Sequence, residues 1–306
     1  MTGTPLLIDC DPGVDDAIAI FLALASPELD LQAVTTVAGN RPIEQVTRNA
    51  RGLLSLAGRS DIPVHQGCHG GLLPRTVRWS SAHGDDGLGG LALPDEGAPV
   101  APGHAVDVLV ARIMAAAPGT VTLAAIGPLT NVAMAFAMEP SLPSLLKRLV
   151  IMGGSVGAPG NITPMAEFNF MHDPVAAHIV LTSGAPIDLF GLNLTRQVLV
   201  SADVLEDFAR AGTPCTQAAR TMLAAYATRD SAIHDPCVIA MLLAPDLFTS
   251  HPARVVVDYR PGPTEGASLV DPTNAEGAPT VNVVDTADAG RVLSLFVERI
   301  SRLGAR

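Results

Sequence analysis

Charged and aromatic residues are scarce in this chain of 306 residues. Charged side chains make up 16% of it and aromatic ones 4%, whereas hydrophobic residues make up 48%. Basic residues are especially few, because 19 Lys and Arg stand against 30 Asp and Glu, and the formal net charge is −11. Binding to nucleic acid or to an anionic membrane needs clustered positive charge. The composition therefore disfavours both partners and predicts a small-molecule ligand.

Closely spaced cysteines and long apolar runs are also missing. The four cysteines are scattered along the chain, unlike the close pairs of zinc sites or small disulfide frameworks. No segment contains 18 uninterrupted apolar residues, and the first residues lack the basic and apolar regions of a signal peptide. We expect free thiols in a reducing compartment, and a soluble, cytoplasmic protein.

The chain alternates between strand-like and helix-like segments, and its length allows a large core. This alternation predicts one α/β domain over residues 1–306, with a mainly parallel central sheet flanked by helices. Strand-like runs cover 6–9, 31–37, 121–126, 149–152 and 186–192, with one near 64; helix-like runs cover 15–25, 43–57, 106–116, 129–138, 174–182, 202–211 and 216–228.

Two regions depart from that alternation. Residues 67–104 are rich in Gly, Pro and His without a clear period, so they are expected to form a long loop, and such loops often carry function. Near the C-terminus, short strands at 255–259, 267–270 and 280–284 predict a small additional β element before a closing helix at 287–303.

The most informative segment is DCDPGVDDA at residues 9–17, which follows a short apolar run. It places Asp9, Asp11, Asp15 and Asp16 at a strand-to-helix turn. Like charges this close require a cation or bound protons. An N-cap at Asp11 and an acidic first helical turn would explain only part of the cluster. Oxygen ligands favour Ca²⁺ or Mg²⁺ over zinc.

A second polar cluster lies in segment 160–170, after the strand predicted at 149–152. It contains Asn161, Glu167 and Asn169. Ligands of parallel sheets bind beyond the carboxyl ends of the strands, and this mixture of donors and acceptors suits a polyhydroxylated substrate such as a sugar. The segment by itself equally fits an Asn in a turn beside a solvated Glu.

The third cluster is His234-Asp235-Pro236, which precedes an apolar helix. In a purely structural interpretation, Asp235 is an N-cap, Pro236 is the first helical residue and His234 is a packed histidine. In the functional interpretation, Asp235 completes the metal site and the imidazole of His234 lies within reach of the substrate.

Read together, the three clusters resemble the inosine–uridine nucleoside hydrolase family. The acidic segment 9–17 is similar to the family's N-terminal signature. TTVAGN at 35–40, IGPLTN at 126–131, AEFN at 166–169 and HDP at 234–236 follow in the family's order. The resemblance extends along the whole chain and predicts hydrolysis of the N-glycosidic bond of ribonucleosides, releasing free base and ribose.

The resemblance implies a Ca²⁺ ion held by Asp11, Asp16, Asp235 and the backbone carbonyl of Ile126. The 2′- and 3′-hydroxyls of ribose would complete its shell. A metal-bound water, deprotonated toward Asp11, would attack the anomeric carbon. His234 would protonate the leaving base.

The remaining implied residues contact the substrate. Carboxylates and amides would bind the ribose hydroxyls and stabilise an oxocarbenium-like transition state, and a histidine of the long loop would line the base pocket. The ribose set is Asp15, Asn40, Asn161, Glu167 and Asn169; His83 lines the base pocket; Met152 and Phe168 supply apolar surface near the sugar.

The resemblance also predicts a homodimer or homotetramer. The sequence departs from the family pattern at two places. Asn193 stands where many relatives have Asp, and the segment 226–231, in a region that contacts the base, is shorter than in some relatives. The base preference is therefore open.

Two other functions compete with the hydrolase. A haloacid dehalogenase-type phosphatase also has an Asp-x-Asp after its first strand and binds Mg²⁺, but it needs a phosphate-binding lysine, and Lys147 is the single lysine of this chain. A non-catalytic Ca²⁺-dependent nucleoside-binding protein could use the same ligands. The presence of both a base, Asp11, and an acid, His234, favours the enzyme.

Overall fold

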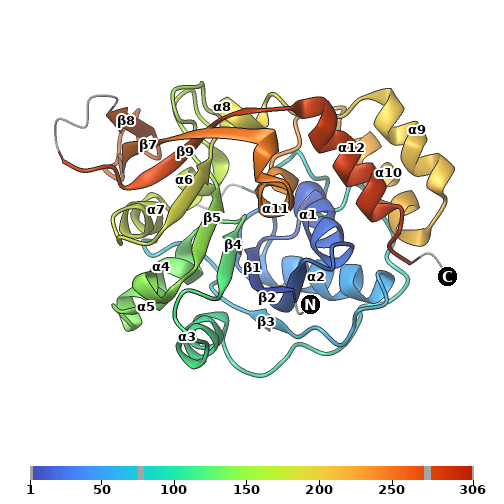
Figure 1. Ribbon diagram of the computed structural model, residues 1–306, viewed down its shortest axis with the longest axis horizontal. Helices are drawn as coiled ribbons and strands as arrows, with labels where there is room; N and C mark the ends of the chain where they lie inside the picture. The colour runs from blue at the N-terminus through green and yellow to red at the C-terminus, as the bar shows by residue number, and fades with distance from the viewer. Residues whose placement is uncertain (1–2, 75–78, 272–276, 305–306) are drawn as a thin grey trace.

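The computed structural model describes residues 3–74, 79–271 and 277–304. Within them, nine strands form one sheet in the order β3-β2-β1-β4-β5-β6-β9-β7-β8 (Figure 1). The pairs from β3 to β9 are parallel, and β7 and β8 add antiparallel pairs at one edge. The strands are β1 Thr4–Cys10, β2 Leu29–Thr36, β3 Val64–Gln66, β4 Thr122–Ala125, β5 Arg148–Met152, β6 Ile187–Phe190, β7 Phe248–Val257, β8 Ser268–Asp271 and β9 Val281–Ala287.

Helices cover both faces of the sheet and bury two apolar cores (Figure 1). One layer contains α1 Val14–Leu24, α2 Ile43–Leu56, α9 Ala202–Ala211, α10 Pro214–Tyr226, α11 Pro236–Leu243 and α12 Ala289–Ile300; the other contains α3 Ala105–Ala115, α4 Thr130–Met138, α5 Leu142–Leu145 and α7 Pro174–Leu181. The short elements α6 Phe168–His172, α8 Leu192–Thr195 and the 3₁₀ turn Pro245–Leu247 complete the described chain.

Strand β1 illustrates why the predicted layers form. Its side chains alternate between the two cores, with Leu6 and Ile8 in one and Leu7 in the other. A strand buried on both faces reads as a continuous apolar run, as expected for a parallel sheet between two helix layers. The predicted α/β class is confirmed, and the predicted additional β element near the C-terminus is present as antiparallel pairs.

Several predicted boundaries are wrong. The strand expected at 186–192 ends at Phe190, and α8 begins two residues later. The strand expected at 255–259 begins at Phe248 because it pairs with β9 from there. The closing helix begins at Ala289, since Asp288 caps it by accepting a hydrogen bond from the backbone N–H of Arg291 at 3.1 Å. Strand β9 also joins the main sheet, parallel to β6.

The predicted long loop is confirmed where the structure describes it. Residues 67–74 and 79–104 form no helix or strand, and 75–78 lie outside the described residues. The described cysteines are all unpaired. Across these same residues, no helix combines the length and apolarity that crossing a bilayer demands.

Candidate active site

The carboxyl ends of the central strands assemble the site. Asp11 directly follows β1, and Ile126 directly follows β4. Asn40 comes four residues after the end of β2, and Met152 is the last residue of β5. Parallel strands present their carboxyl ends at one edge of the sheet, so these residues converge. The N-termini of α1 and α11, which pack against each other, open at the same edge.

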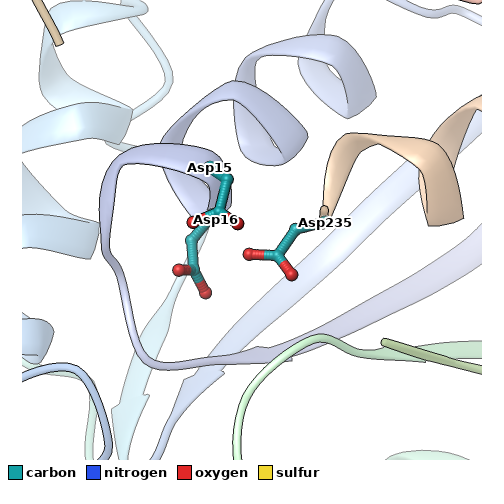
Figure 2. Close-up of side chains that lie close together, drawn as sticks. All are labelled: Asp15, Asp16 and Asp235. Carbon is teal, nitrogen blue, oxygen red and sulfur yellow. The ribbon is translucent and has the colours of Figure 1, made fainter. Parts of the chain in front are cut away.

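Asp15 and Asp16 in the first turn of α1 point toward Asp235 at the start of α11 (Figure 2). One carboxylate oxygen from each of the three lies within 4.8 Å of the others, and all three residues are buried. This group contains Asp15 but not Asp11. The fold therefore brings carboxylates 220 positions apart in the chain into one cluster.

The start of α1 differs from the N-cap interpretation of Asp11. The N-cap is Gly13, and Asp16 is the side chain that accepts from the turn. Its Oδ2 accepts from the Gly13 N–H at 2.8 Å and its Oδ1 from the Asp11 N–H at 3.2 Å. Similarly, Asp235 occupies the N-cap position of α11 without a capping hydrogen bond from its side chain. The prediction of an N-cap at Asp11 is therefore wrong, whereas Asp235 does hold the N-cap position before Pro236, although its side chain does not cap the helix.

Asp11 lies beneath this cluster with its two oxygens in different surroundings. Oδ2 accepts a hydrogen bond of 2.6 Å from the Asn40 N–H. Oδ1 is buried and has no hydrogen-bond partner among the described residues. A Cβ added to Gly127 would lie 2.6 Å from Oδ1, which places this oxygen beside the Ile126–Gly127 backbone.

Burial and mutual repulsion both disfavour the ionised form of these carboxylates. Desolvation and the charge of Asp15 raise the pKa of Asp16 to about 7. Desolvation and neighbouring carboxylates raise the pKa values of Asp11 and Asp235 well above their ordinary range. The unpartnered, buried Oδ1 of Asp11 beside this cluster fits a hard cation, because a cation offsets both costs while the carboxylates stay ionised.

Asp9 has a supporting position. Its Oδ1 accepts hydrogen bonds from Thr35 Oγ1 at 2.6 Å and Asn131 Nδ2 at 2.8 Å. Burial raises its pKa to about 7, although both hydrogen bonds work in the opposite direction. Asp9 thereby ties β1 to β2 and to the start of α4 below the acidic turn.

Glu167 and Asn169 form an ordered wall on the other side of the site. Glu167 caps α6: its Oε1 accepts from the Asn169 N–H at 2.8 Å, and its Oε2 from the N–H groups of Gly154 and Phe170 at 2.9 and 3.1 Å. Burial still raises the pKa of Glu167. These backbone donors hold the carboxylate in one orientation before any substrate arrives.

Asn169 reaches from this wall to the strand ends. Its Nδ2 donates to the carbonyl oxygens of Ile126 at 3.0 Å and Met152 at 3.2 Å. The Ile126 carbonyl predicted as a metal ligand therefore already accepts one hydrogen bond. A carbonyl oxygen has two lone pairs, so one remains for a cation.

A cavity of about 470 Å³ opens above these groups. Among the described residues, Asp11 and Asp16 are the predicted site residues that do not line it. Its lining includes the predicted Asp15, Asn40, His83, Ile126, Met152, Asn161, Glu167, Phe168, Asn169, His234 and Asp235, together with Trp79, Ser80, Ser81, Ala82, Ile162, Tyr226, Arg229 and Asp230.

The lining residues that were not predicted individually come mainly from 79–82 in the long loop and from 226–230, which begins at the last residue of α10. The second set belongs to the segment 226–231, which the resemblance placed in a region that contacts the base. The signal for the first was the length of the loop. The signal for the second was the position of the segment directly before His234. Neither segment has a motif that assigns a role to an individual residue.

Two histidines line the cavity next to these segments. His83 stacks on Tyr226 with ring centroids 5.0 Å apart, and its Nδ1 accepts from the Val14 N–H at 3.1 Å. Burial lowers the pKa of His83, so its ring is neutral at neutral pH.

His234 is held from both sides. Its Nδ1 lies 2.7 Å from Thr195 Oγ1, and its Nε2 lies 3.3 Å from Asp230 Oδ2. Burial pulls the pKa of His234 down, but Asp230 and nearby carboxylates outweigh it and raise the pKa above its ordinary value.

This arrangement of buried acids below a cavity with an imidazole at its wall is accompanied by clear similarity to known proteins. Residues 6–294 match the family described as inosine-uridine preferring nucleoside hydrolase. The chain belongs to the nucleoside hydrolase family. As a member it is a ribonucleoside hydrolase, a glycosidase, which favours that function over the phosphatase and the non-catalytic binding protein.

Relatives of this nucleoside hydrolase match along nearly their whole length. Pyrimidine-specific ribonucleoside hydrolase RihA of Photobacterium profundum is 40% identical, over 97% of this chain and 98% of its own. Among solved structures, a purine-preferring ribonucleoside hydrolase from Gardnerella vaginalis superposes with a TM-score of 0.91 at 31% identity, covering 98% of this chain and 99% of its own. A plant nucleoside hydrolase, PpNRh1, gives a TM-score of 0.88 at 37% identity, covering 97% and 99%.

Proposed function

We propose that this hydrolase depends on Ca²⁺, held by Asp11, Asp16, Asp235 and the carbonyl of Ile126. The observation that carries the proposal is the buried, unpartnered Oδ1 of Asp11 beside a cluster of desolvated carboxylates. The donors are all oxygens, which suits a hard cation that accepts many ligands at flexible angles. Asp15, which belongs to the same cluster and lines the cavity, would face the sugar.

Ca²⁺ bound there would lower the pKa of a water molecule and orient the vicinal hydroxyls of ribose. Asp11 would then be the general base.

The ribose would lie between Asp15 and the wall of Asn161, Glu167 and Asn169, all of which line the cavity. Cleavage of the N-glycosidic bond leaves positive charge on the sugar. The carboxylates of Asp15 and Glu167 would stabilise this charge in the transition state. Glu167 is well suited to the task because three backbone N–H groups fix its two oxygens.

The departing base would accept a proton from Nε2 of His234. This nitrogen faces the cavity end lined by Asp230 and Tyr226, whereas Nδ1 is engaged by Thr195. Asn40 would support both sides of the metal site, because its Nδ2 donates to the Asp11 carbonyl and to Asp16 Oδ2.

Release of ribose tests this proposal directly. The protein is dialysed against a chelator and incubated with inosine, uridine, cytidine and adenosine, with and without added Ca²⁺, and reducing sugar is measured. We expect ribose from at least one nucleoside, loss of activity after chelation and recovery with Ca²⁺. Full activity in the chelator would refute the metal dependence, and no ribose from any substrate would refute the hydrolase function.

We also propose a homodimer or homotetramer and a cytoplasmic location. The family resemblance implies this oligomeric state, and light scattering of the purified protein tests it. The four unpaired cysteines support a reducing compartment.

A further inference from the structure

The pair formed by Asp230 and His234 stands out in the outer cavity. Asp230 Oδ1 accepts a hydrogen bond of 2.9 Å from the Ala232 N–H, which orients the carboxylate, and Oδ2 lies 3.3 Å from His234 Nε2. The Asp230 side chain remains 35% exposed, and both residues line the cavity. The pair therefore presents two polar atoms side by side to whatever occupies the base end.

The chemistry of the partners fixes which atom donates. An ionised carboxylate only accepts, so the proton in this contact lies on His234 Nε2. In the neutral ring, Nδ1 then accepts from the hydroxyl of Thr195 at 2.7 Å. Burial works to raise the pKa of Asp230, but its hydrogen bond with His234 outweighs burial and lowers the pKa, which keeps the carboxylate ionised. The cavity wall thus offers a donor beside an acceptor.

Nucleobases differ in whether they match this pattern. Adenine presents a ring-nitrogen acceptor, N7, next to an amino donor, N6. Cytosine has the same pair in N3 and its 4-amino group. Hypoxanthine presents two adjacent acceptors, N7 and O6, and uracil presents N3–H beside O4, so neither base offers an acceptor next to an exocyclic donor.

We propose that Asp230 and His234 together select nucleosides whose base carries an exocyclic amine beside a ring-nitrogen acceptor, namely cytidine and adenosine, over their oxo counterparts uridine and inosine. This inference rests on the proposed function of the same cavity. Nε2–H of His234 donates to the ring nitrogen, and the amine donates to Asp230 Oδ2.

The hydrogen bonds that each kind of base can form support this preference. The 3.3 Å contact between Nε2 and Oδ2 is longer than a usual hydrogen bond to a charged group. An amino base replaces this long contact with two hydrogen bonds and leaves no polar atom unpaired. An oxo base turns a lone pair toward the carboxylate and takes away its donor, so two acceptors face each other without a hydrogen between them.

The experiment measures kcat/KM for cytidine and uridine, and for adenosine and inosine, with the Ca²⁺-loaded protein. The decisive quantity is the change in the amino-to-oxo ratio on Asp230→Asn, because the intrinsic reactivity of each nucleoside cancels. The Asn amide also donates, so it accommodates an oxo group. We expect the ratio to fall by about tenfold or more in each pair.

A matched control is Asp207→Asn, which removes an exposed carboxylate on α9 that pairs with Arg210. Its ratios should equal those of the parent protein. If Asp230→Asn lowers both members of each pair equally, Asp230 only orients His234 and the inference is wrong. A parent protein that favours uridine and inosine while the variant leaves that preference unchanged would also overturn it.

Failure of the proposed function gives a different result, namely no ribose from any of the four nucleosides. In that case the dissociation constants of cytidine and uridine, measured by calorimetry on the parent protein and Asp230→Asn, still decide the preference. Tighter binding of cytidine that is lost in the variant supports the inference, and equal binding of both nucleosides refutes it.

Discussion

The two ends of the cavity are built differently. The inner end rests on residues that follow central strands or begin α1 and α11, and its carboxylates are buried. The outer end is formed by the connections 79–83 and 226–230, where Trp79 is 39% exposed and the Asp230 side chain 35% exposed. A sheet fixes the chemistry-bearing groups, whereas loops tolerate change. Related enzymes can therefore keep one reaction and vary the base they accept.

The largest predicted effect lies at the inner end. Asp11→Asn removes the proposed general base at nearly constant volume, so kcat should fall by about 10²–10⁴-fold. Circular dichroism should show an unchanged fold. Turnover close to that of the parent protein would contradict the assigned role.

His234 lies between the two ends and should show a substrate-dependent effect. His234→Ala should lower kcat/KM by about 10²-fold for inosine and cytidine, because their bases need a proton to depart. The loss should be much smaller for p-nitrophenyl riboside, whose leaving group needs no acid. Equal losses on both kinds of substrate would rule out acid catalysis by His234.

A methyl group added at Gly39 tests how tightly the inner end is packed. A Cβ at Gly39 would lie 2.1 Å from Asp11 Oδ2, so Gly39→Ala must displace that carboxylate. We expect kcat/KM to fall between about 10- and 100-fold, since small misplacements of reacting groups are costly. Gly70→Ala is the control, because no atom of the described residues lies within 4 Å of a Cβ built there. Equal kcat/KM values for Gly39→Ala and Gly70→Ala would show that the inner end is not rigid.

The acidic cluster also predicts how stability depends on pH. In the metal-free protein, burial raises the pKa values of Asp9 and Asp16 to about 7, well above those of an unfolded chain. The folded state thus binds more protons, and the free energy of unfolding should fall as pH rises toward 7, by up to about 1.4 kcal/mol per pH unit for each group.

Denaturant unfolding between pH 5 and pH 8, with a chelator or with Ca²⁺, measures this dependence. Ca²⁺ should reduce the pH dependence of the unfolding free energy that is due to Asp16, since the ion favours the ionised form of this carboxylate. The pH dependence due to Asp9 should remain unchanged. A chelated protein whose unfolding free energy increases over the same range would contradict the raised pKa values.

The smallest effect is expected at the outer end. Arg229 Nη1 donates to the Ala82 carbonyl at 3.4 Å, a long and exposed contact that joins the two connections. Arg229→Ala should lower kcat/KM by no more than about threefold. A loss comparable with that of Gly39→Ala would erase the distinction between the two ends.

Sequence reasoning succeeded where the signal was local or repeated. Alternating apolar runs predicted the parallel sheet, and the acidic turn at residues 9–17 predicted crowded carboxylates at its edge, where the structure has a buried acidic cluster. It was less accurate at 186–192 and 287–303, because a strand end and a helix start depend on partners such as β9 and on the cap at Asp288. The same limit applies to Asp230, which no motif distinguished.

The sequence by itself determined the α/β class and the kinds of side chain at the site, because periodicity and carboxylate spacing are properties of the chain. Tertiary structure decided which atoms remain available. Only in the fold is Asp11 Oδ1 buried without a partner, and only there does Asp230 lie against His234 while Thr195 engages the other nitrogen. These relations depend on desolvation and on the directions of side chains brought together by packing.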